Sequence, residues 1–340
     1  MNTELSLPIG ILKKERIDAM PQSENVKKVV VFGGGTGLST LLRGLKSHSV
    51  DLTAVVTVAD DGGSSGRLLD EYDIPPPGDI RKVMAALSDV EPLIEKMFEY
   101  RFSTSEDLKG HSLGNLILAA MTDITGDFAS AVEKMSRVLN IKGKVLPAAN
   151  QRITLHAELE DGTIVTGESK IPVYGHKIRR VYVSPQEVEP LPETLKVIKA
   201  ADLIIFGPGS LYTSILPTIL VQAIREAVLA CDAKKVYISN LTTQAGETYR
   251  YTASEHVKAL YDHAGEAFID TVLLNGPEIP PLTKGVDWIG PPWLVENDLE
   301  TLQHLVPHIV VKDISKIVDG NLIHDSEKVA KWLMEYMENS

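Results

Sequence analysis

The chain has 340 residues, 44% of them hydrophobic, and a formal net charge of −12 at pH 7. This composition supplies a full hydrophobic core and argues against global disorder, and the length fits one large α/β domain or two smaller ones. The negative charge argues against a general nucleic-acid binder, which needs a basic surface to neutralise phosphates, but it allows a small anionic ligand held by a few local cations.

Targeting and redox features favour a cytoplasmic protein without a membrane span. No apolar run approaches the roughly 18 residues of a membrane span. Pro8 and Gly10 interrupt the apolar run near the N-terminus, so no secretory signal is expected. Cys231 is the single cysteine, which excludes a disulfide framework. Residues 1–27 have no clear hydrophobic period and are expected to form a flexible extension.

The first predicted elements are a strand over 29–32 and a helix over 36–46, joined by a glycine-rich turn at 33–37. Glycines let the backbone approach an anion closely, and the free N–H groups of a first helical turn attract it. The turn lacks the third glycine of the dinucleotide fingerprint and the Lys-Ser or Lys-Thr pair of a P-loop. Close packing of helix on strand is the alternative role of these glycines. The residues expected to contact a phosphate or sugar are Gly34, Gly35, Thr36 and Gly37.

A second apolar run, over 52–58, leads into the polar sequence "ADDGGSSGR" at 59–67. Paired carboxylates after a buried strand can bind Mg²⁺ together with a phosphate, accept hydrogen bonds from a ribose, or cap a turn. The candidate ligand-binding residues of this loop are Asp60, Asp61, Ser64, Ser65 and Gly66.

Helices are expected over roughly 80–100, 111–121 and 128–139. Arg67 and Arg81 are candidate phosphate partners, because a guanidinium group pairs with phosphate in a forked geometry; a salt bridge to a neighbouring acid is the alternative. The candidates added by this region are Asp79, Arg81, His111 and Asn115.

His111 and Asn115 lie four residues apart, so on a helix they share one face. Asn115 suits contact with a base or sugar, whereas His111 fits acid–base chemistry or helix N-terminal packing. The sequence "GHSLGN" lacks the final glycine and the preceding strand of a nucleophile elbow, so no hydrolase triad is expected.

Residues 151–184 alternate apolar and polar positions around an Asp-Gly turn, which predicts an inserted antiparallel β-hairpin. The α/β alternation then returns, with polar loops at 207–214 and 240–248. In open parallel sheets, ligands bind outside the carboxyl ends of the strands, at a topological switch point. Four polar glycine-, hydroxyl- or amide-rich loops at such ends therefore predict a ligand cleft, with helix capping as the alternative for each. The candidates in the last two loops are Gly207, Gly209, Ser210, Thr213 and Asn240.

The predicted fold is α/β, with a mostly parallel sheet, helices on both faces and the inserted hairpin. The later strands are expected at 203–206, 235–239, 271–274 and 308–311, and the later helices at 216–229, 254–264 and 325–337. The predicted organisation is an extension (1–27), one domain (28–325) with its β insertion (151–184), and a C-terminal helix (326–340).

Several motifs together resemble the YvcK-like proteins, in the superfamily of the phospholactate transferases of deazaflavin cofactor synthesis. They are "VVVFGGGTGLSTLLRGL", "TVADDGGSSGRL", "IPPPGDIRK", "GHSLGNL", "GDF", "GKVLPA", "DGTIVTGES" and "ADLIIFGPGSLYTSILP". The resemblance runs from about residue 28 to near 325, with the motifs in order.

This resemblance implies a Rossmann-like fold and a cleft for a nucleotide diphosphate compound. The YvcK-like branch is associated with UDP-sugars, notably UDP-N-acetylglucosamine, carries the label gluconeogenesis factor, and is linked to cell shape and wall synthesis. The transferase branch moves a phospholactyl group from a guanosine diphosphate donor using Mg²⁺. Its acidic pair matches Asp60 and Asp61, and Asp61 best fits the metal-associated position. That branch does not carry "DDGGSSGR" in this form, so the loop favours the YvcK-like branch.

Three functions remain, in this order: a nucleotide-sugar-binding regulatory protein without turnover, an Mg²⁺-dependent phospholactyl-type transferase, and an NAD(P)-binding protein. Asp61 is the one catalytic candidate if the chain is a transferase. We expect a small nucleotide as partner, no nucleic acid and no membrane. A homo-oligomer and a regulatory partner in cell-wall synthesis are left open.

Overall fold

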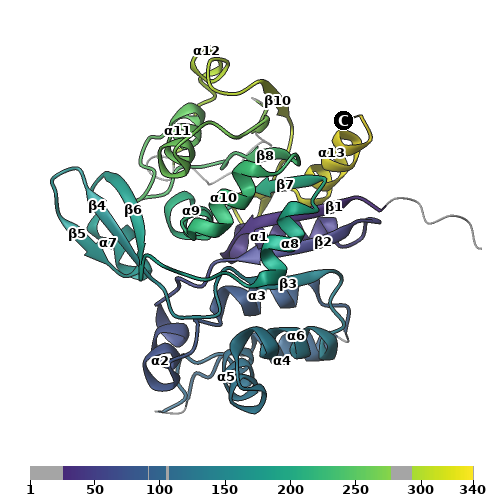
Figure 1. The fold of residues 1–340 in the computed structure, drawn as a ribbon, viewed down its shortest axis with the longest axis vertical. Coiled ribbons are helices and arrows are strands. Elements are labelled where there is room, and N and C mark those ends of the chain that lie inside the picture. Colours follow the sequence, from purple (N-terminus) through teal and green to yellow (C-terminus); the bar gives the residue numbers. More distant parts are fainter. Residues whose placement is uncertain (1–25, 91, 105–106, 277–292, 340) are drawn as a thin grey trace, which may run out of the picture.

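A computed structural model describes residues 26–90, 92–104, 107–276 and 293–339, so the predicted extension lies almost wholly outside the described residues. Seven strands in these ranges form one parallel sheet in the order β10-β9-β8-β7-β1-β2-β3 (Figure 1). The strands are β1 (Lys28–Gly33), β2 (Asp51–Val56), β3 (Lys144–Pro147), β7 (Leu203–Phe206), β8 (Lys234–Ile238), β9 (Thr271–Asn275) and β10 (His308–Lys312). The sequence analysis missed β3.

The strand order reverses between β1 and β7. The chain adds β2 and β3 on one side of β1, and adds β8, β9 and β10 on the other side of β7. A crevice is expected outside the carboxyl ends of the strands at such a switch point. The predicted glycine-rich turns at 33–37 and 207–214 both begin at this switch point.

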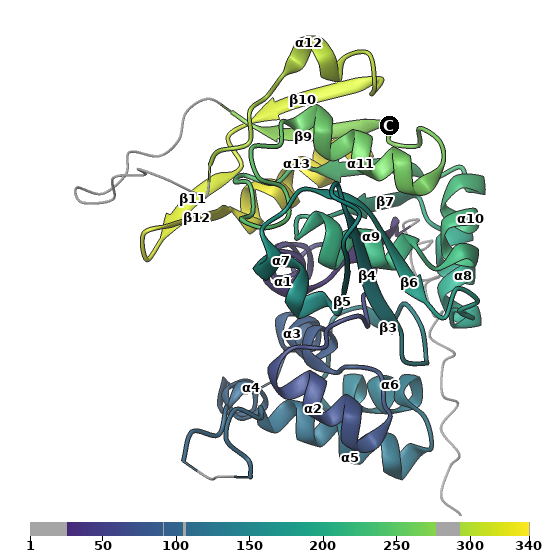
Figure 2. The same cartoon turned by 90° about the vertical axis from the view of Figure 1, so that its left-hand side faces the viewer.

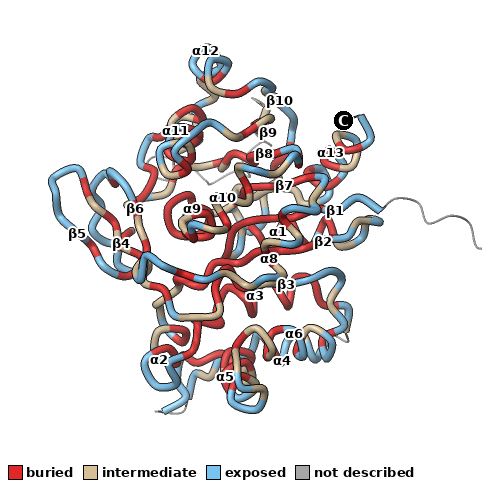
Figure 3. The backbone as a smooth tube through the Cα atoms, in the orientation of Figure 1, coloured by how far each residue is buried: buried red, intermediate tan, exposed pale blue. Residues whose placement is uncertain are grey.

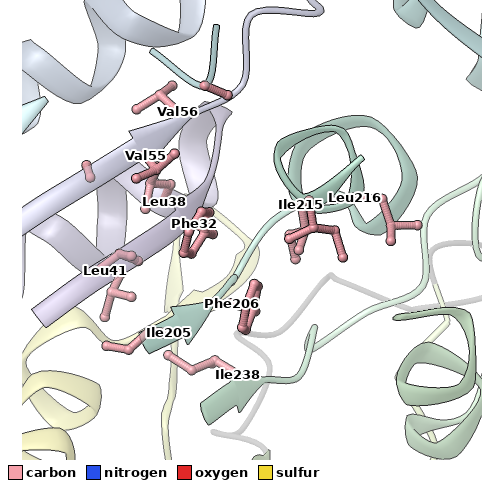
Figure 4. Close-up of a cluster of buried hydrophobic side chains, with 14 of the residues drawn as sticks. Phe32, Leu38, Leu41, Val55, Val56, Ile205, Phe206, Ile215, Leu216 and Ile238 are labelled. Carbon is pink, nitrogen blue, oxygen red and sulfur yellow. The ribbon is translucent and has the colours of Figure 1, made fainter. Parts of the chain in front are cut away.

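Aromatic packing fixes the pairing of β1 with β7. Phe32 and Phe206 face one another in register, are both fully buried, and stack with ring centroids 5.2 Å apart and planes 13° apart. Figure 4 shows them beside Ile205, Ile215 and Ile238 in the core, and Figure 3 shows how continuously the central strands are buried. Burying such a side chain contributes about 1.5–3 kcal/mol.

Helices cover both faces of the sheet, as predicted. On one face α1 (Gly35–Leu45) packs against α3 (Gly78–Leu87) and α13 (Ser326–Glu338); elsewhere α8 (Pro192–Lys199) packs against α10 (Gln222–Ala230). Right-handed crossovers put α1 and α10 on opposite faces, because the strands that they connect progress in opposite directions across the sheet. In Figure 2, α8 and α10 lie together on one side.

A group of helices lies below the β3 edge (Figures 1 and 2). Its members are α2 (Gly63–Tyr72), α4 (Pro92–Glu99), α5 (Leu113–Thr125) and α6 (Phe128–Val138). Two expectations are corrected here. The loop predicted over 59–67 ends early, because α2 begins inside it. The helix predicted over 80–100 is two helices, α3 and α4, since Ser88 is extended and Pro92 suits a helix start rather than an interior.

The predicted hairpin at 151–184 is a three-stranded antiparallel sheet in the order β5-β4-β6. Its strands are β4 (Thr154–Leu159), β5 (Ile164–Thr166) and β6 (Ile178–Ser184). Between β5 and β6 the chain forms a 3₁₀ turn, η1 (Glu168–Lys170), and the short helix α7 (Ile171–Tyr174). The segment 167–174 is called the insertion tip below.

The rest of the chain differs from expectation in detail. The helix predicted at 216–229 is a π-helical turn, η2 (Leu211–Ile215), followed by α9 (Leu216–Ile219) and α10. The remaining elements are α11 (Ala253–Ala264), α12 (Leu299–Leu302) and an antiparallel pair that was not predicted, β11 (Ser315–Val318) with β12 (Asn321–His324). Within the described ranges no single helix is long and apolar enough to cross a bilayer. The continuous segment η2–α9 and the helix α10 would together be long and apolar enough, but they are bent by 78° relative to one another.

The packing of α13 on α1 yields a stability prediction. A Cβ added at Gly44 would overlap the carbonyl oxygen of Ser326. Gly44→Ala gains up to about 1 kcal/mol of helix propensity but incurs an overpacking cost of about 1–3 kcal/mol. We expect a lower free energy of unfolding in urea titrations. A stabilised variant would mean that α13 does not seat against this turn of α1.

Candidate functional site

A polar cleft of about 500 Å³ lies at the carboxyl ends of β1, β7 and β8. Its walls come from the start of α1, the loop after β2, the start of α3, the insertion tip, the loops after β7 and β8, and β12. The lining residues are Gly34, Gly35, Thr36, Gly37, Thr40, Asp60, Asp79, Lys82, Glu168, Pro208, Gly209, Ser210, Ser214, Asn240, Leu241, Thr242, Gln244, Leu322, Ile323 and His324.

The N-terminus of α1 opens into this cleft, and the Asp79 carboxyl group lies against its N-cap residue, Gly34. Gly34 at the N-cap makes no side-chain cap bond, and the first turn holds no acidic residue. Gly35 has φ +63°, a conformation that favours glycine. A Cβ at Gly37 would lie 2.5 Å from the carbonyl oxygen of Pro208, so the two glycine-rich loops meet backbone to backbone. The first-turn N–H groups and the helix dipole there can attract an anion.

The start of the helix after β7 differs, because Glu247 occupies it. The Thr213 hydroxyl donates to Oε1 of Glu247 (3.2 Å), and the backbone N–H groups of Tyr212 and Thr213 bond the same carboxyl group. Burial raises the pKa of Glu247 to about 7, although these hydrogen bonds oppose the shift. The two helix starts at the switch point are thus unequal, because Glu247 is hydrogen-bonded to the start of η2, whereas the start of α1 lines the cleft with Asp79 beside it.

Carboxyl groups form one wall of the cleft. Asp79 lies beneath Gly34 and accepts a hydrogen bond from Nζ of Lys82 at 2.9 Å. Burial, followed by the charge of Asp79, raises the pKa of Asp60. Glu168 reaches in from the insertion tip, where burial, followed by the charges of Asp60 and Asp79, raises its pKa to about 8.

The opposite wall carries amides and hydroxyls. Nε2 of Gln244 donates to Oγ of Ser210 at 2.6 Å. Oδ1 of Asn240 and Oε1 of Gln244 are buried without a hydrogen-bond partner among the described residues. Buried acceptors without partners are costly, so this wall favours a ligand that brings hydroxyl or N–H donors.

Four predicted site residues come together outside the cleft, in a buried network between α2, α3 and α5. Oγ of Ser64 lies 3.0 Å from Nδ1 of His111 and accepts from Nδ2 of Asn115 at 3.1 Å. Nε of Arg81 donates to Oδ1 of Asn115 at 3.0 Å. Burial lowers the pKa of His111, which favours its neutral ring. These four residues bond one another behind the cleft wall.

The remaining predicted residues also lie off the cleft lining. Ser65 bonds the carboxyl group of Asp60, and Gly66 packs against the carbonyl oxygen of Asp61. Gly207 has φ +78° at the turn out of β7. Thr213 is bonded to Glu247.

Asp61, the predicted metal ligand, uses Oδ1 to accept the backbone N–H of Ser169 at 2.8 Å. The described ranges contain no group of three or more His, Cys, Asp or Glu side chains that could hold a metal ion.

Sequence reasoning missed Lys82, Glu168, Gln244 and His324, which line the cleft. Lys82 had a readable signal, because residues 79 and 82 share a face of α3 whereas residue 81 projects elsewhere. Glu168 and His324 had no such sequence signal. Glu168 reaches the cleft from the inserted sheet of β4, β5 and β6, and His324 from the pair β11 and β12, so both depend on long-range packing.

The chain is similar to known proteins over most of its length. The model of the family described as 2-phospho-L-lactate transferase CofD matches residues 29–315. A gluconeogenesis factor of Bacillus subtilis is 58% identical over 311 residues, covering 92% of this chain and 98% of the relative. One from Listeria innocua is 45% identical over 316 residues, covering 93% and 97%. A crystal structure of a Bacillus halodurans protein aligns with TM-score 0.88 and 52% identity, covering 91% of this chain and 100% of that one.

Because Glu247 is buried, we expect the free energy of unfolding of the ligand-free protein to depend on pH. Its pKa in the folded protein is above the usual value of 4.5, so the folded state keeps a proton that the unfolded state loses between about pH 4.5 and 7. Its contribution to stability therefore falls as pH rises through that window. Glu247→Gln removes the titration and should flatten this part of the pH profile of the free energy of unfolding. An identical profile in the variant would contradict the assignment.

Proposed function

The chain belongs to the YvcK-like gluconeogenesis factors of the CofD family, and on that premise we propose that its cleft binds a nucleotide-sugar of the UDP-N-acetylglucosamine type. The protein then acts as a regulatory binding protein in carbon metabolism, cell-wall synthesis and cell shape. The proposed binding residues include Gly34, Gly35, Thr36 and Gly37.

The observation that supports this most is the open start of α1 at the switch point. The first turn of α1 lines the cleft with N–H donors and holds no acidic residue of its own, and the nearest carboxyl group is that of Asp79, against Gly34. On the far wall, Asn240 and Gln244 present unpartnered acceptors. A nucleotide-sugar has both parts, a diphosphate that accepts and hydroxyl or base N–H groups that donate.

A phospholactyl-type transferase is the second candidate, and the match to the CofD family model supports it. Against it, Asp61, the predicted catalytic and metal-binding residue, is bonded to the insertion tip. Product formation from a guanosine diphosphate donor in the presence of Mg²⁺ would favour the transferase over a binding protein.

The wider setting is part of the proposal. We propose that the protein is cytoplasmic and binds a small-molecule ligand. We also propose a protein partner in cell-wall synthesis that distinguishes the ligand-bound protein from the ligand-free protein. Self-association is also part of this proposal.

Ligand preference is the first test of this function. UDP-N-acetylglucosamine should stabilise the protein against thermal unfolding more than NAD does. At 100 times its Kd, one ligand adds about 2.7 kcal/mol to the stability of the folded state. Equal or larger stabilisation by NAD, measured at the same ligand concentration, would instead favour a dinucleotide-binding protein.

The second test places the diphosphate at α1. Gly35→Ala adds a methyl group on the cleft side, with no protein atom closer than 3.9 Å to it, and should weaken nucleotide-sugar binding at least tenfold in calorimetric titration. Gly63→Ala is the matched control, since Gly63 also begins a helix at positive φ (+48°) and has open space around its Cβ. Both variants incur a left-handed backbone cost of about 1–2 kcal/mol. Equal affinities of the two variants for the nucleotide-sugar would contradict binding of its diphosphate at the α1 turn.

A further inference from the structure

The cleft presents an electrostatic problem for an anionic ligand. Asp60, Asp79 and Glu168 line it, and Lys82, the one lysine or arginine among the lining residues that the structure describes, is already paired with Asp79 at 2.9 Å. Three ionised carboxylates would repel a diphosphate bound at the start of α1. A diphosphate that binds here without a bridging cation therefore requires the wall to give up negative charge.

Glu168 is held in this wall from two directions. The backbone N–H of its neighbour Ser169 donates to Asp61 at 2.8 Å. On the other side, Gly246 packs so closely against the carbonyl oxygen of Pro172 that no side chain fits there. The insertion tip is thus fixed between the loops after β2 and β8, and it carries the Glu168 side chain to the cleft.

Acidic groups face Glu168 from each surrounding element. Asp60 and Asp61 come from the loop after β2, Asp79 from α3, and Glu247 from the loop after β8. Lys82 on α3 lines the same cleft but pairs with Asp79, and Lys170 follows on the tip itself. Burial and all four acids raise the pKa of Glu168, to about 8. Its carboxyl group is therefore largely neutral at pH 7, which removes one of the three negative charges.

We propose that Glu168 binds the anionic ligand of this cleft in its carboxylic acid form, donating a hydrogen bond to a phosphate or sugar oxygen. The inference rests on the proposed function, since it requires an anion in the cleft. A protonated carboxyl group has one O–H donor, whereas the ionised group only accepts and repels the ligand. The inserted sheet thereby adds a proton-dependent contact to the site that the parallel sheet builds.

The expected signature is a loss of affinity at alkaline pH. If only the protonated form is competent, its fraction falls from about 0.9 at pH 7 to about 0.1 at pH 9, and the apparent affinity falls about tenfold. Glu168→Gln keeps size, neutrality and a donor at every pH. It should bind within about threefold of wild type at pH 7 and lose the tenfold change, whereas Glu168→Ala should bind weakly throughout.

The experiment is calorimetric titration of UDP-N-acetylglucosamine between pH 6.5 and 9 in the presence of EDTA. Glu187→Gln, at an exposed glutamate outside the cleft, is the matched control and should follow wild type. Comparing variants at one pH cancels any titration of the ligand, and circular dichroism melts at each pH verify folding. Wild type and Glu168→Gln sharing one pH profile would overturn the proposal while leaving the proposed function intact. So would a Gln variant that loses binding at pH 7, because the ionised carboxylate would then be the binding form. Absence of binding by wild type at every pH would overturn the proposed function itself.

Discussion

The register of β1 against β7 is the constraint on which the site depends. The stacked Phe32 and Phe206 are the last fully buried side chains before the chain turns out of each strand. Because their pairing fixes where both strands end, the two glycine-rich turns begin at the same height on the sheet. At that height a Cβ added at Gly37 would overlap the carbonyl oxygen of Pro208, so the two turns lie against one another.

Charge then makes the crevice asymmetric. Both helices that start at the switch point can attract an anion, but Glu247 already occupies the start of η2. The α1 start faces the cleft, and carboxyl groups from three different segments line that cleft, with Asp79 next to Gly34. A site with donors on one wall, acceptors on the other and excess acid between them suits a ligand that is anionic in part and rich in hydroxyl groups. It also explains why a small antiparallel sheet is attached to a doubly wound one: the insertion tip completes the wall and carries Glu168.

The parallel sheet and the position of the cleft were predictable, because strand-end loops repeat a local pattern. The turn at 33–37 and the residues Asp60, Ser210 and Asn240 lie where strand-end reasoning placed them, and Asp79 lines the cleft from the start of α3. Domain boundaries and ligand contacts remain predictions. The residues Ser64, Arg81, His111 and Asn115 were expected at the ligand and instead bond one another outside the cleft lining, since polar residues on one helix face give no sign of which neighbour they meet. Likewise the bond from Asp61 to Ser169 spans 108 residues, and no local period reports such a contact.

The most direct measurement is a crystal structure of the complex with UDP-N-acetylglucosamine. The account predicts diphosphate oxygens within hydrogen-bond distance of the backbone N–H groups of the first α1 turn, next to Gly35. It also predicts base or sugar donors on the wall of Asn240 and Gln244. A diphosphate seated on η2 in place of the Glu247 carboxyl group, or outside the cleft altogether, would contradict it.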